Sequence, residues 1–341
     1  AYIGFSGKHI GSLNNRVAVN INRDDHLVTP AALRRGLTSI RQIVLPQDRL
    51  MLRTIPRRYF LDGLAGIKNP LGMHGFRLDL EAHIVTAGVV HTQNIGMCLQ
   101  VAGVGIEELV ANPIASAEAV LEPEDKEAGV ILADIGGGTT DIAVLGEGSI
   151  WHTSVLPVGG IQVTKDIASG LGIPFSVAEE LKVKYGALIP EGEGWTETIN
   201  LETEKYSVSQ ADLCYIIRAR IEEILRMILL EIPRSEYTPV TMVLTGGTAK
   251  LSGIEEYAQQ LVGLSVRVES PKGLPQTAEK LNDPIYTSSI GLLLWGANQA
   301  EGEEEERVTL TDGLGRFYSD LISTIRSIWS RRPRIKIESS R

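Results

Sequence analysis

The residues best suited to chemistry form one run, Asp134-Ile135-Gly136-Gly137-Gly138-Thr139-Thr140-Asp141. Three consecutive glycines allow backbone N–H groups to converge on an anion, because no Cβ atom stands in the way. Asp134 would point at the same anion, and a carboxylate beside a phosphate needs a cation between them, such as Mg²⁺ held through water. The hydroxyl of Thr139 can add a contact. The run therefore predicts a phosphate-binding loop, with a plain tight hairpin carrying a glycine bulge as the alternative.

A second glycine turn, Thr245-Gly246-Gly247-Thr248, lies much later in the chain. A flat ligand ring can lie against the bare backbone of Gly246 and Gly247, since glycine permits close approach to the main chain. An ordinary turn between a strand and a helix is the alternative for so short a pattern. Neither run has the spacing of a Rossmann fingerprint or of a P-loop, so those two nucleotide-binding motifs are excluded.

Apolar runs beside the two turns predict the elements that position them. Residues 130–133 read as a strand that enters the first turn, and residues 142–145 as the strand that leaves it, so together they predict a hairpin. A further turn is expected at residues 146–148. Residues 241–244 read as a strand before the second turn, and a helix is expected to begin near Ser252 or Gly253.

The composition is that of a folded protein with an acidic balance. The 341 residues are 43% hydrophobic and 22% charged, and this length predicts two domains, or one domain with large insertions. Because 42 Asp and Glu outnumber 33 Lys and Arg, the net charge of −9 disfavours a surface for duplex nucleic acid. The sequence has no uncharged apolar run of about 18 residues, as a transmembrane helix requires. Cys98 and Cys214 are too few and too far apart for a disulfide framework, which favours a reducing compartment.

The C-terminal part of the chain differs from the rest in charge. Residues 301–306 read Glu-Gly-Glu-Glu-Glu-Glu, and we expect an acidic linker over 301–312. Residues 313–341 hold seven Lys and Arg against two Asp and Glu, a net charge of +5. Apolar residues recur there at steps of three and four, which predicts an amphipathic helix over 313–333, ended by Pro333 and followed by a basic tail, 334–341. The apolar stripe consists of Leu314, Phe317, Tyr318, Leu321, Ile322, Ile325, Ile328 and Trp329.

Such a helix can lie in a membrane interface. Its apolar face supplies burial, and each arginine that meets an anionic head group contributes about 1 kcal/mol. We therefore predict that this helix binds anionic lipids. A terminal helix packed on the protein's own core is the alternative. The acidic linker disfavours that alternative, because packed elements are usually joined by short connections.

The first glycine run and its strands, Val130 to Asp141, resemble the second phosphate loop of the actin, Hsp70 and sugar-kinase superfamily. Thr245-Gly246-Gly247 resembles the adenosine loop of that superfamily, and Ala178-Glu179-Glu180-Leu181-Lys182, followed by Tyr185-Gly186, is similar to its helix beside the adenine and ribose. Glu179 and Lys182 are three residues apart and share a helix face, with a surface ion pair as the alternative reading.

The resemblance implies ATP and Mg²⁺ as ligands, with Asp134 holding the metal through water. The implied phosphate-binding residues are Asp134, Gly136, Gly137, Gly138, Thr139, Thr140, Gly159 and Gly160. The implied adenosine-binding residues are Glu179, Lys182, Gly246, Gly247 and Thr248.

Further motifs are similar to those of the FtsA family of bacterial cell-division proteins, in the same order over about residues 1–300. They are Phe5-Ser6-Gly7-Lys8-His9-Ile10, Pro70-Leu71-Gly72-Met73-His74-Gly75, Gln93-Asn94-Ile95, His152-Thr153-Ser154-Val155-Leu156-Pro157-Val158-Gly159-Gly160 and Asp283-Pro284-Ile285-Tyr286-Thr287-Ser288-Ser289-Ile290-Gly291-Leu292. Several unrelated short motifs in a shared order make the resemblance specific.

The resemblance implies an α/β, actin-like (ribonuclease H-like) nucleotide-binding fold with an inserted α+β subdomain. Residues 1–82 would form the inserted subdomain and 83–143 the remainder of the first nucleotide-binding subdomain. Residues 144–176 and 237–300 would form the second nucleotide-binding subdomain, with 177–236 as its lid.

The resemblance also implies a function. The protein would bind ATP, polymerise on the inner face of the cytoplasmic membrane at the division site, and tether the tubulin-like protein FtsZ there. Its partners would be the FtsZ C-terminal peptide, further copies of itself, anionic lipids and other division proteins, with no nucleic acid. A lid helix around 210–231 would receive the FtsZ peptide, with a solvated helix face as the alternative. The implied contact residues are Arg218, Arg220, Glu222, Glu223 and Arg226.

Two departures from the family pattern affect these expectations. The superfamily duplicates its hairpin, and this sequence has no Asp-x-Gly copy ahead of the inserted subdomain. Because the first residue is also Ala1 rather than Met, we expect a fragment, N-terminally truncated, in which a strand at 83–89 has an unpaired edge. Relatives often carry Glu at the position of Asn112, and Asn cannot act as a base, so at most weak ATPase activity is expected and no residue is assigned as catalytic.

Two other functions remain as alternatives. One is an ATP-binding scaffold of pilus assembly from the same superfamily, without membrane binding of its own, which the apolar stripe from Leu314 to Trp329 disfavours. The other is a working kinase or ATPase, which would require the first phosphate loop and a carboxylate base near Asn112.

Overall fold

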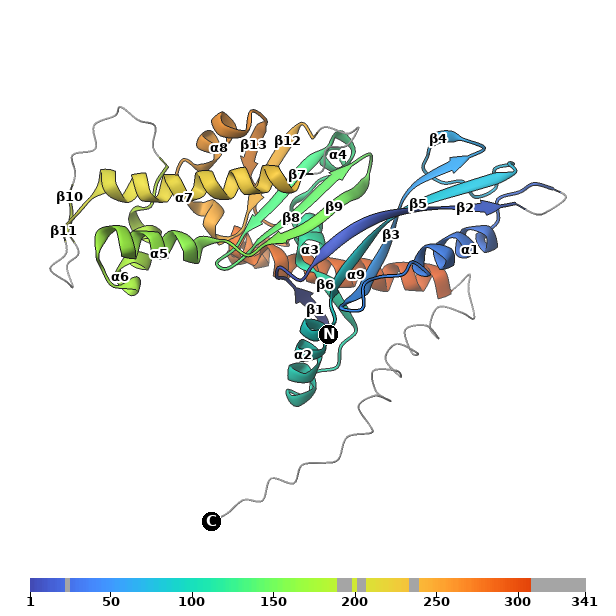
Figure 1. Cartoon of the computed structure of the whole chain (residues 1–341), viewed down its shortest axis with the longest axis horizontal. Coiled ribbons are helices and arrows are strands. Elements are labelled where there is room, and N and C mark those ends of the chain that lie inside the picture. Colours follow the sequence, from blue (N-terminus) through green and yellow to red (C-terminus); the bar gives the residue numbers. More distant parts are fainter. Residues whose placement is uncertain (22–24, 189–197, 201–206, 233–238, 308–341) are drawn as a thin grey trace, which may run out of the picture. The chain divides into compact units, whose positions relative to one another are not determined.

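The computed structural model describes residues 1–21, 25–188, 198–200, 207–232 and 239–307. Its largest sheet has the strand order β13-β12-β7-β8-β9 (Figure 1). β7 (Val130–Ile135), β12 (Thr241–Thr245) and β13 (Ser265–Val268) are parallel, and β8 (Thr140–Gly146) is antiparallel to both β7 and β9 (Ser149–Leu156). The hairpin predicted over 130–145 is thus confirmed. All of β7 and β8 is buried, which requires covering layers on both faces.

Successive residues of β7 enter two different cores, as the two-residue period of a strand dictates. Ile131 and Ile135 pack into the core under four helices on one face, α5 (Gly160–Leu171), α6 (Phe175–Tyr185), α7 (Gln210–Glu231) and α8 (Ile254–Val262). Val130 and Leu132 pack on the other face with α3 (Asn112–Val120), which is followed by α4 (Pro123–Ala128). Figure 1 shows α7 running past the strands of this sheet, with α5 beside it.

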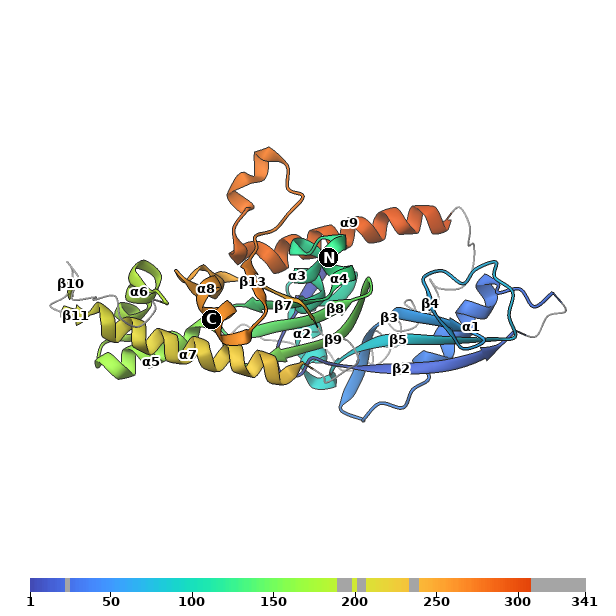
Figure 2. The same cartoon turned by 90° about the horizontal axis from the view of Figure 1, so that it is seen from above.

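A second sheet, with the order β2-β5-β3-β4, is antiparallel throughout. Its strands are β2 (Gly11–Asn20), β3 (Arg49–Leu61), β4 (Leu64–Ile67) and β5 (Arg77–Gly88). Helix α1 (Pro30–Arg41) lies along this sheet and buries Ala32, Gly36 and Ile40 (Figure 2). The expectation of an unpaired edge at 83–89 is wrong, because β5 lies between β2 and β3 and is paired on both sides.

β1 (Tyr2–Phe5) pairs in parallel with β6 (Glu108–Ala111), and α2 (Val89–Val101) leads from β5 to β6. Residues 2–5 therefore pair with the segment that we expected to form the first nucleotide-binding subdomain, and not with the second sheet. The expected boundary between 82 and 83 falls inside β5. The second sheet thus begins at β2 and includes the whole of β5.

The second sheet meets the edge strand β9 through side chains instead of a backbone ladder. Ser12 Oγ donates to the carbonyl of Thr153 at 2.8 Å and accepts from its amide at 2.9 Å. Asn14 donates to the carbonyl of Trp151 at 3.0 Å. The ring of His83 bridges Asn14 Oδ1 at 2.8 Å and Thr153 Oγ1 at 3.0 Å. These side chains satisfy backbone groups that an edge strand would otherwise leave open.

The remaining described elements are a short strand pair, three 3-10 turns and a helix at the C-terminal end of the described chain. They are the strand pair β10 (Thr198–Asn200) and β11 (Ser207–Ser209), the 3-10 turns η1 (Gly247–Lys250), η2 (Gln276–Leu281) and η3 (Pro284–Tyr286), and helix α9 (Thr287–Arg307). α9 continues through the acidic run, so residues 301–307 of the expected linker are helical. Residues 308–312, the predicted amphipathic helix and the basic tail lie outside the described residues. Within the described residues, no helix combines the length and the apolar character needed to cross a bilayer.

Candidate functional site

The first glycine turn is closed by its own backbone and presents bare main chain. The amide of Gly136 donates to the carbonyl of Thr139 at 2.9 Å, which ends the β7–β8 ladder at the pair Ile135 and Thr140. Among the described residues, the amides of Gly137 and Gly138 have no acceptor. A Cβ added at Gly138 would meet nothing within 4 Å. Two donors without partners beside open space are the cradle expected for an anion.

The N-terminus of α5 packs directly behind this turn. The amide of Gly160 donates to the carbonyl of Gly136 at 2.9 Å, and that of Ile161 to the carbonyl of Gly137 at 2.7 Å. The amide of Gly159 donates to Gln162 Oε1 at 3.0 Å, and a Cβ at Gly159 would lie 2.6 Å from the Gly136 carbonyl oxygen. The amides of Gly159 and Gly160, both predicted to bind phosphate, are thus engaged by the protein. Their glycine identity lets α5 approach and support the turn.

The second glycine turn contacts the first, because β12 and β7 are parallel neighbours that end at the same edge of the sheet, with Thr245 paired to Asp134. Gly246 has a φ of +88°, and a Cβ there would lie 2.3 Å from Asp134 Oδ1. Thr248 Oγ1 donates to the carbonyl of Gly136 at 2.9 Å. The two turns that the sequence predicts as parts of one site are therefore in contact.

Helix α6 brings the predicted pair Glu179 and Lys182 to the same place. Lys182 Nζ donates to the carbonyl of Gly160 at 3.2 Å, to Thr164 Oγ1 at 2.9 Å and to Glu179 at 2.7 Å. Only 13% of the Lys182 side chain is exposed, so this contact is more than a solvated surface pair. Burial by itself raises the pKa of Glu179, but hydrogen bonds from Lys182 and Thr164 outweigh it and lower that pKa.

Asp134 is buried at the end of β7 and accepts two hydroxyl hydrogen bonds on one oxygen. Ser116 Oγ of α3 donates to Oδ2 at 2.7 Å, and Ser288 Oγ of α9 donates to the same atom at 2.8 Å. Burial raises the pKa of Asp134, and the two serines oppose that shift. Sequence reasoning did not predict Ser116, and it noted Ser288 only inside a family motif. Neither has a local pattern that marks it as a neighbour of Asp134.

Asp141 is a second buried acid, opposite Asp134 in the β7–β8 ladder, and it was not predicted as a site residue. Ser6 Oγ donates to Asp141 Oδ1 at 2.6 Å and also contacts Thr139 Oγ1 at 3.2 Å. Burial raises the pKa of Asp141 to about 7, with the charge of Asp134 acting in the same direction and the bond from Ser6 against it. Its position at the end of the run Asp-x-x-x-x-x-x-Asp was the signal that could have identified it.

Two other residues noted in the sequence, Thr140 and Asn112, have clear positions. Thr140 is buried and donates to the carbonyl of Val158 at 2.8 Å, so its hydroxyl holds the segment before Gly159. Asn112 begins α3, one turn before Ser116. Its Oδ1 is buried and has no hydrogen-bond partner among the described residues, and it would lie 2.6 Å from a Cβ at Gly4. An orphaned acceptor of this kind calls for a donor, such as water or a ligand.

These features fit a phosphate-bearing ligand. The Gly137 and Gly138 amides can donate, Lys182 supplies a nearby positive charge, and Asp134 keeps one oxygen free of serine bonds. Among the described residues, no group of three or more His, Cys, Asp or Glu is arranged to hold a metal ion directly. A cation beside Asp134 would then complete its shell with water and ligand oxygens, as Mg²⁺ commonly does.

The charged residues predicted on α7 are engaged in contacts within the chain. Arg220 forms an ion pair with Asp166 of α5 at 2.5 Å and contacts Glu223. Arg226 pairs with Glu222 at 2.7 Å, and Glu222 also accepts from the hydroxyl of Tyr257 at 2.9 Å. The Arg218 guanidinium lies 5.1 Å from the centre of the Tyr257 ring. The predicted membrane residues, Leu314 to Trp329, lie outside the described residues.

Two family profiles match the chain. The profile described as "Cell division protein FtsA" matches residues 131–291, and that described as "SHS2 domain inserted in FTSA" matches residues 7–86. The Cell division protein FtsA of Pseudomonas aeruginosa is 37% identical over 310 residues, covering 89% of this chain and 74% of that protein. The Escherichia coli K12 protein of the same name is 31% identical over 329 residues, covering 92% of this chain and 78% of its own length.

Two solved structures resemble the fold. The PilM-PilN type IV pilus biogenesis complex gives a TM-score of 0.55 at 19% identity, covering 84% of this chain and 76% of that chain. MreB5 of Spiroplasma citri bound to ADP gives a TM-score of 0.50 at 17% identity, covering 64% of this chain and 68% of that chain. At these identities the likeness concerns the fold alone. The predicted actin-like α/β fold with an inserted subdomain is confirmed.

Proposed function

This chain belongs to the FtsA family of cell division proteins, and we propose that it binds ATP with Mg²⁺ between its two glycine turns. The supporting observation is that four separate segments meet there. The first glycine turn, the start of α5, the Gly246–Gly247 turn and Lys182 of α6 are joined by direct contacts. The nucleotide in the solved MreB5 structure, a protein with a similar fold, agrees with this assignment.

In this proposal, the chain's own residues bind and orient the ligand. The amides of Gly137 and Gly138 donate to phosphate oxygens, and Lys182 places its charge beside them. Glu179 and the Gly246, Gly247 and Thr248 turn border the adenosine. Asp134 holds the metal through water, and bound Mg²⁺ would neutralise the repulsion between this carboxylate and the phosphates.

We propose that hydrolysis is slow and that ATP serves chiefly as a structural ligand that favours a polymer. The candidate position for a base is Asn112, whose side chain cannot take a proton from water at neutral pH. Asp141, with a pKa of about 7, is better suited to act as a base, but its Oδ1 already accepts a hydrogen bond from Ser6. We assign no catalytic residue.

We further propose that the protein polymerises and tethers FtsZ to the inner face of the cytoplasmic membrane at the division site. The FtsZ C-terminal peptide would bind α7 at Arg218, Arg220, Glu222, Glu223 and Arg226. Of these, Glu223 and Arg226 are exposed, Arg218 and Glu222 are half-buried beside Tyr257, and Arg220 pairs with Asp166 of α5. The predicted helix over 313–333 would bind anionic lipids. Other division proteins would be further partners.

The alternative function, a pilus-assembly scaffold, has less support. The likeness to the PilM-PilN complex is one of fold at 19% identity, whereas the cell-division relatives reach 37% over most of the chain.

Calorimetric titration with Mg·ATP tests nucleotide binding. It is carried out on the full chain, and Asp134→Ala and Lys182→Met should each weaken binding at least tenfold. Lys184→Met is the matched control, because Lys184 forms an exposed ion pair with Glu180 on the same helix.

Two results would count against the proposal. Equal affinities for the Lys182 and Lys184 variants would remove α6 from the site, and an Asp134→Ala variant that binds Mg·ATP as well as the parent would remove the acid.

A further inference from the structure

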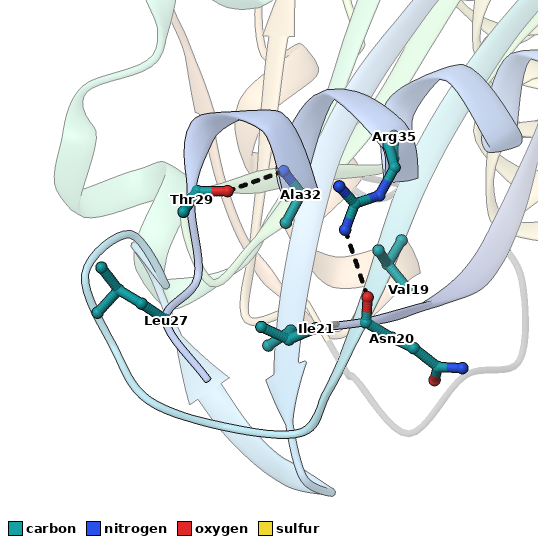
Figure 3. Close-up of a pocket in the computed structure, with 7 residues that line it drawn as sticks. All are labelled: Val19, Asn20, Ile21, Leu27, Thr29, Ala32 and Arg35. Atoms are coloured by element: carbon teal, nitrogen blue, oxygen red, sulfur yellow. Dashed lines mark hydrogen bonds between the residues drawn. The ribbon is translucent and has the colours of Figure 1, made fainter. Parts of the chain in front are cut away.

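A groove lies on the second sheet, far from the glycine turns in sequence, between the end of β2 and the start of α1. It has a volume of about 430 Å³. Figure 3 shows the side chains that line it. The apolar ones are Val19, Ile21, Leu27 and Ala32, and the polar ones are Asn20, Thr29 and Arg35. This size and this largely apolar lining with a few polar groups are typical of a pocket that receives side chains of a ligand.

The groove is built from well-held elements. The hydroxyl of Thr29 caps α1 by accepting from the amide of Ala32 at 3.4 Å. The amide of Ile21 donates to the carbonyl of Phe76 at 2.9 Å, and Leu27 forms a backbone bridge with His74. The floor is therefore fixed by bonds to the rest of the sheet and does not depend on a ligand to form.

Helix α1 carries three arginines that have no acidic partner within the part of the chain that the structure describes. Arg34, Arg35 and Arg41 form no ion pair with any described residue, and the helix itself contains no Asp or Glu. Several arginines of the same sheet are paired with acids: Arg16 and Arg77 with Asp79, and Arg57 with Glu81. Arg49 of β3 instead donates to the carbonyl of His9 and to the hydroxyl of Thr86. The only hydrogen bond shown for Arg35 goes to the carbonyl of Asn20 at 3.3 Å, a long bond that a carboxylate could replace with a stronger one (Figure 3).

The charge of the surrounding segment has the sign opposite to that of the whole chain. Residues 1–88 contain 12 Lys and Arg and 6 Asp and Glu, whereas the complete chain has a net charge of −9. A positive surface on an acidic protein steers acidic ligands to one place while the rest of the molecule repels them. Because two of the three arginines, Arg34 and Arg35, are exposed, their charges are accessible beside the groove.

We propose that this groove binds an acidic peptide segment of another protein that carries a bulky apolar side chain. The apolar side chain fills the space over Val19, Ile21 and Ala32, and flanking carboxylates pair with Arg34 and Arg35. The mostly apolar lining of the groove offers the base edges of a nucleic acid few polar groups with which to pair. The chain's own acidic run, Glu-Gly-Glu-Glu-Glu-Glu at 301–306, lacks the apolar residue, which favours a different protein over a second copy.

Fluorescence anisotropy with a labelled octapeptide tests this proposal on the full chain. The probe has a central Leu-Phe pair flanked on each side by three Asp or Glu residues, and salt is kept at about 150 mM, where the Debye length is about 8 Å. Saturable binding is expected. Arg35→Glu should weaken it at least tenfold. Replacing Leu-Phe by Ser-Ser in the probe should weaken it at least fivefold.

Lys68→Glu is the matched control, because Lys68 lies just after β4 of the same sheet, its side chain is 79% exposed, and the charge change is the same. It should leave binding within twofold of the parent. Circular dichroism confirms that each variant is folded, and Arg34→Gln with Arg35→Gln replaces Arg35→Glu if that variant is not.

Three results would overturn the proposal. They are absence of saturable binding, equal weakening by Arg35→Glu and Lys68→Glu, and equal affinity for the Leu-Phe and Ser-Ser probes. Sedimentation velocity provides a fourth: self-association that Arg35→Glu abolishes, without probe binding, would make the groove a contact between copies. The assay contains no nucleotide, so its outcome is independent of the proposed ATP site.

Discussion

Asp134 and Asp141 lie directly opposite each other in the antiparallel ladder of β7 and β8, with 6% and 4% of their surfaces exposed. Like charges in a cross-strand pair repel, and burial adds a desolvation cost. Hydroxyl donors offset part of that cost, from Ser116 and Ser288 to Asp134 and from Ser6 to Asp141. The site thus holds two carboxyl groups in an arrangement that a bound cation would favour.

Asp141→Asn should stabilise the ligand-free protein at pH 8. The pKa of Asp141 in the folded protein is about 7, above its ordinary value of 3.8, so the folded protein binds the carboxyl proton more tightly than the unfolded chain does. The stability that this protonated carboxyl contributes is lost as the pH rises through 7. A neutral side chain of the same shape removes the buried charge, for an expected gain of about 1–4 kcal/mol in the free energy of unfolding. Urea denaturation measures it.

The gain from Asp141→Asn should shrink at pH 5, where the parent carboxyl is protonated in the folded protein. Glu180→Gln, in an exposed pair with Lys184, is the control and should change stability by less than about 0.5 kcal/mol at either pH. A loss of stability at pH 8 would show that the carboxylate is satisfied by its neighbours.

Gly159→Ala should displace the first glycine turn and abolish nucleotide binding. Gly138→Ala should leave the turn in place and have little effect on the fold. A Cβ at position 159 would lie 2.6 Å from the Gly136 carbonyl oxygen and 2.8 Å from that of Gly137, so the first glycine turn must move. A Cβ at position 138 meets nothing within 4 Å. Titration with Mg·ATP and thermal melting compare the two, and a Gly159→Ala variant that binds like the parent would contradict the described packing of α5.

His83 should make the protein less stable in mild acid. It has no exposed surface, and burial, with smaller effects from Arg57 and His152, lowers its pKa from 6.5 to about 3. The unfolded chain therefore binds more protons between those two values, and the stability contributed by the neutral ring is lost as pH falls below about 6.5. Denaturation between pH 7 and 5 should show a smaller pH dependence for His83→Gln than for the parent.

His74→Gln is the control for that experiment, because His74 is an exposed histidine on the neighbouring loop. It should keep the pH dependence of the parent. If His83→Gln also keeps the pH dependence of the parent, the prediction is wrong, and the junction between the second sheet and β9 tolerates a charged His83 ring.

Leu321→Glu combined with Ile325→Glu should abolish pelleting of the protein with liposomes that contain anionic lipid. Both residues belong to the predicted apolar stripe, and a charge on that stripe removes the burial that supports interfacial binding. Ser319→Glu with Ser323→Glu adds the same charge between stripe positions and should reduce binding less. Unchanged pelleting of the first variant would contradict the membrane role.

The local parts of the site could be predicted from the sequence. The glycine turn between two apolar strands and the second glycine turn after residues 241–244 appear where expected. The helix over 210–231, which only the family resemblance implied, is also present. Glycine runs and the two- and 3.6-residue periods of apolar residues act within a few positions, so they are readable without the fold. The predicted closeness of the two turns is likewise confirmed, by the contact of Thr248 with Gly136.

The sequence by itself determined which backbone segments could cradle an anion, since glycine's missing Cβ is a property of the residue. Only the tertiary structure decided which side chains surround them: Ser288 reaches Asp134 across 154 positions, and Ser6 reaches Asp141 across 135. The tertiary structure also places β5 between β2 and β3. In it, the amide of Gly160 donates to the backbone carbonyl of Gly136, and the amide of Gly159 donates to the side chain of Gln162. Hydrogen-bond partners far apart in the chain depend on how sheets and helices pack, and no local pattern of residue types encodes that distance.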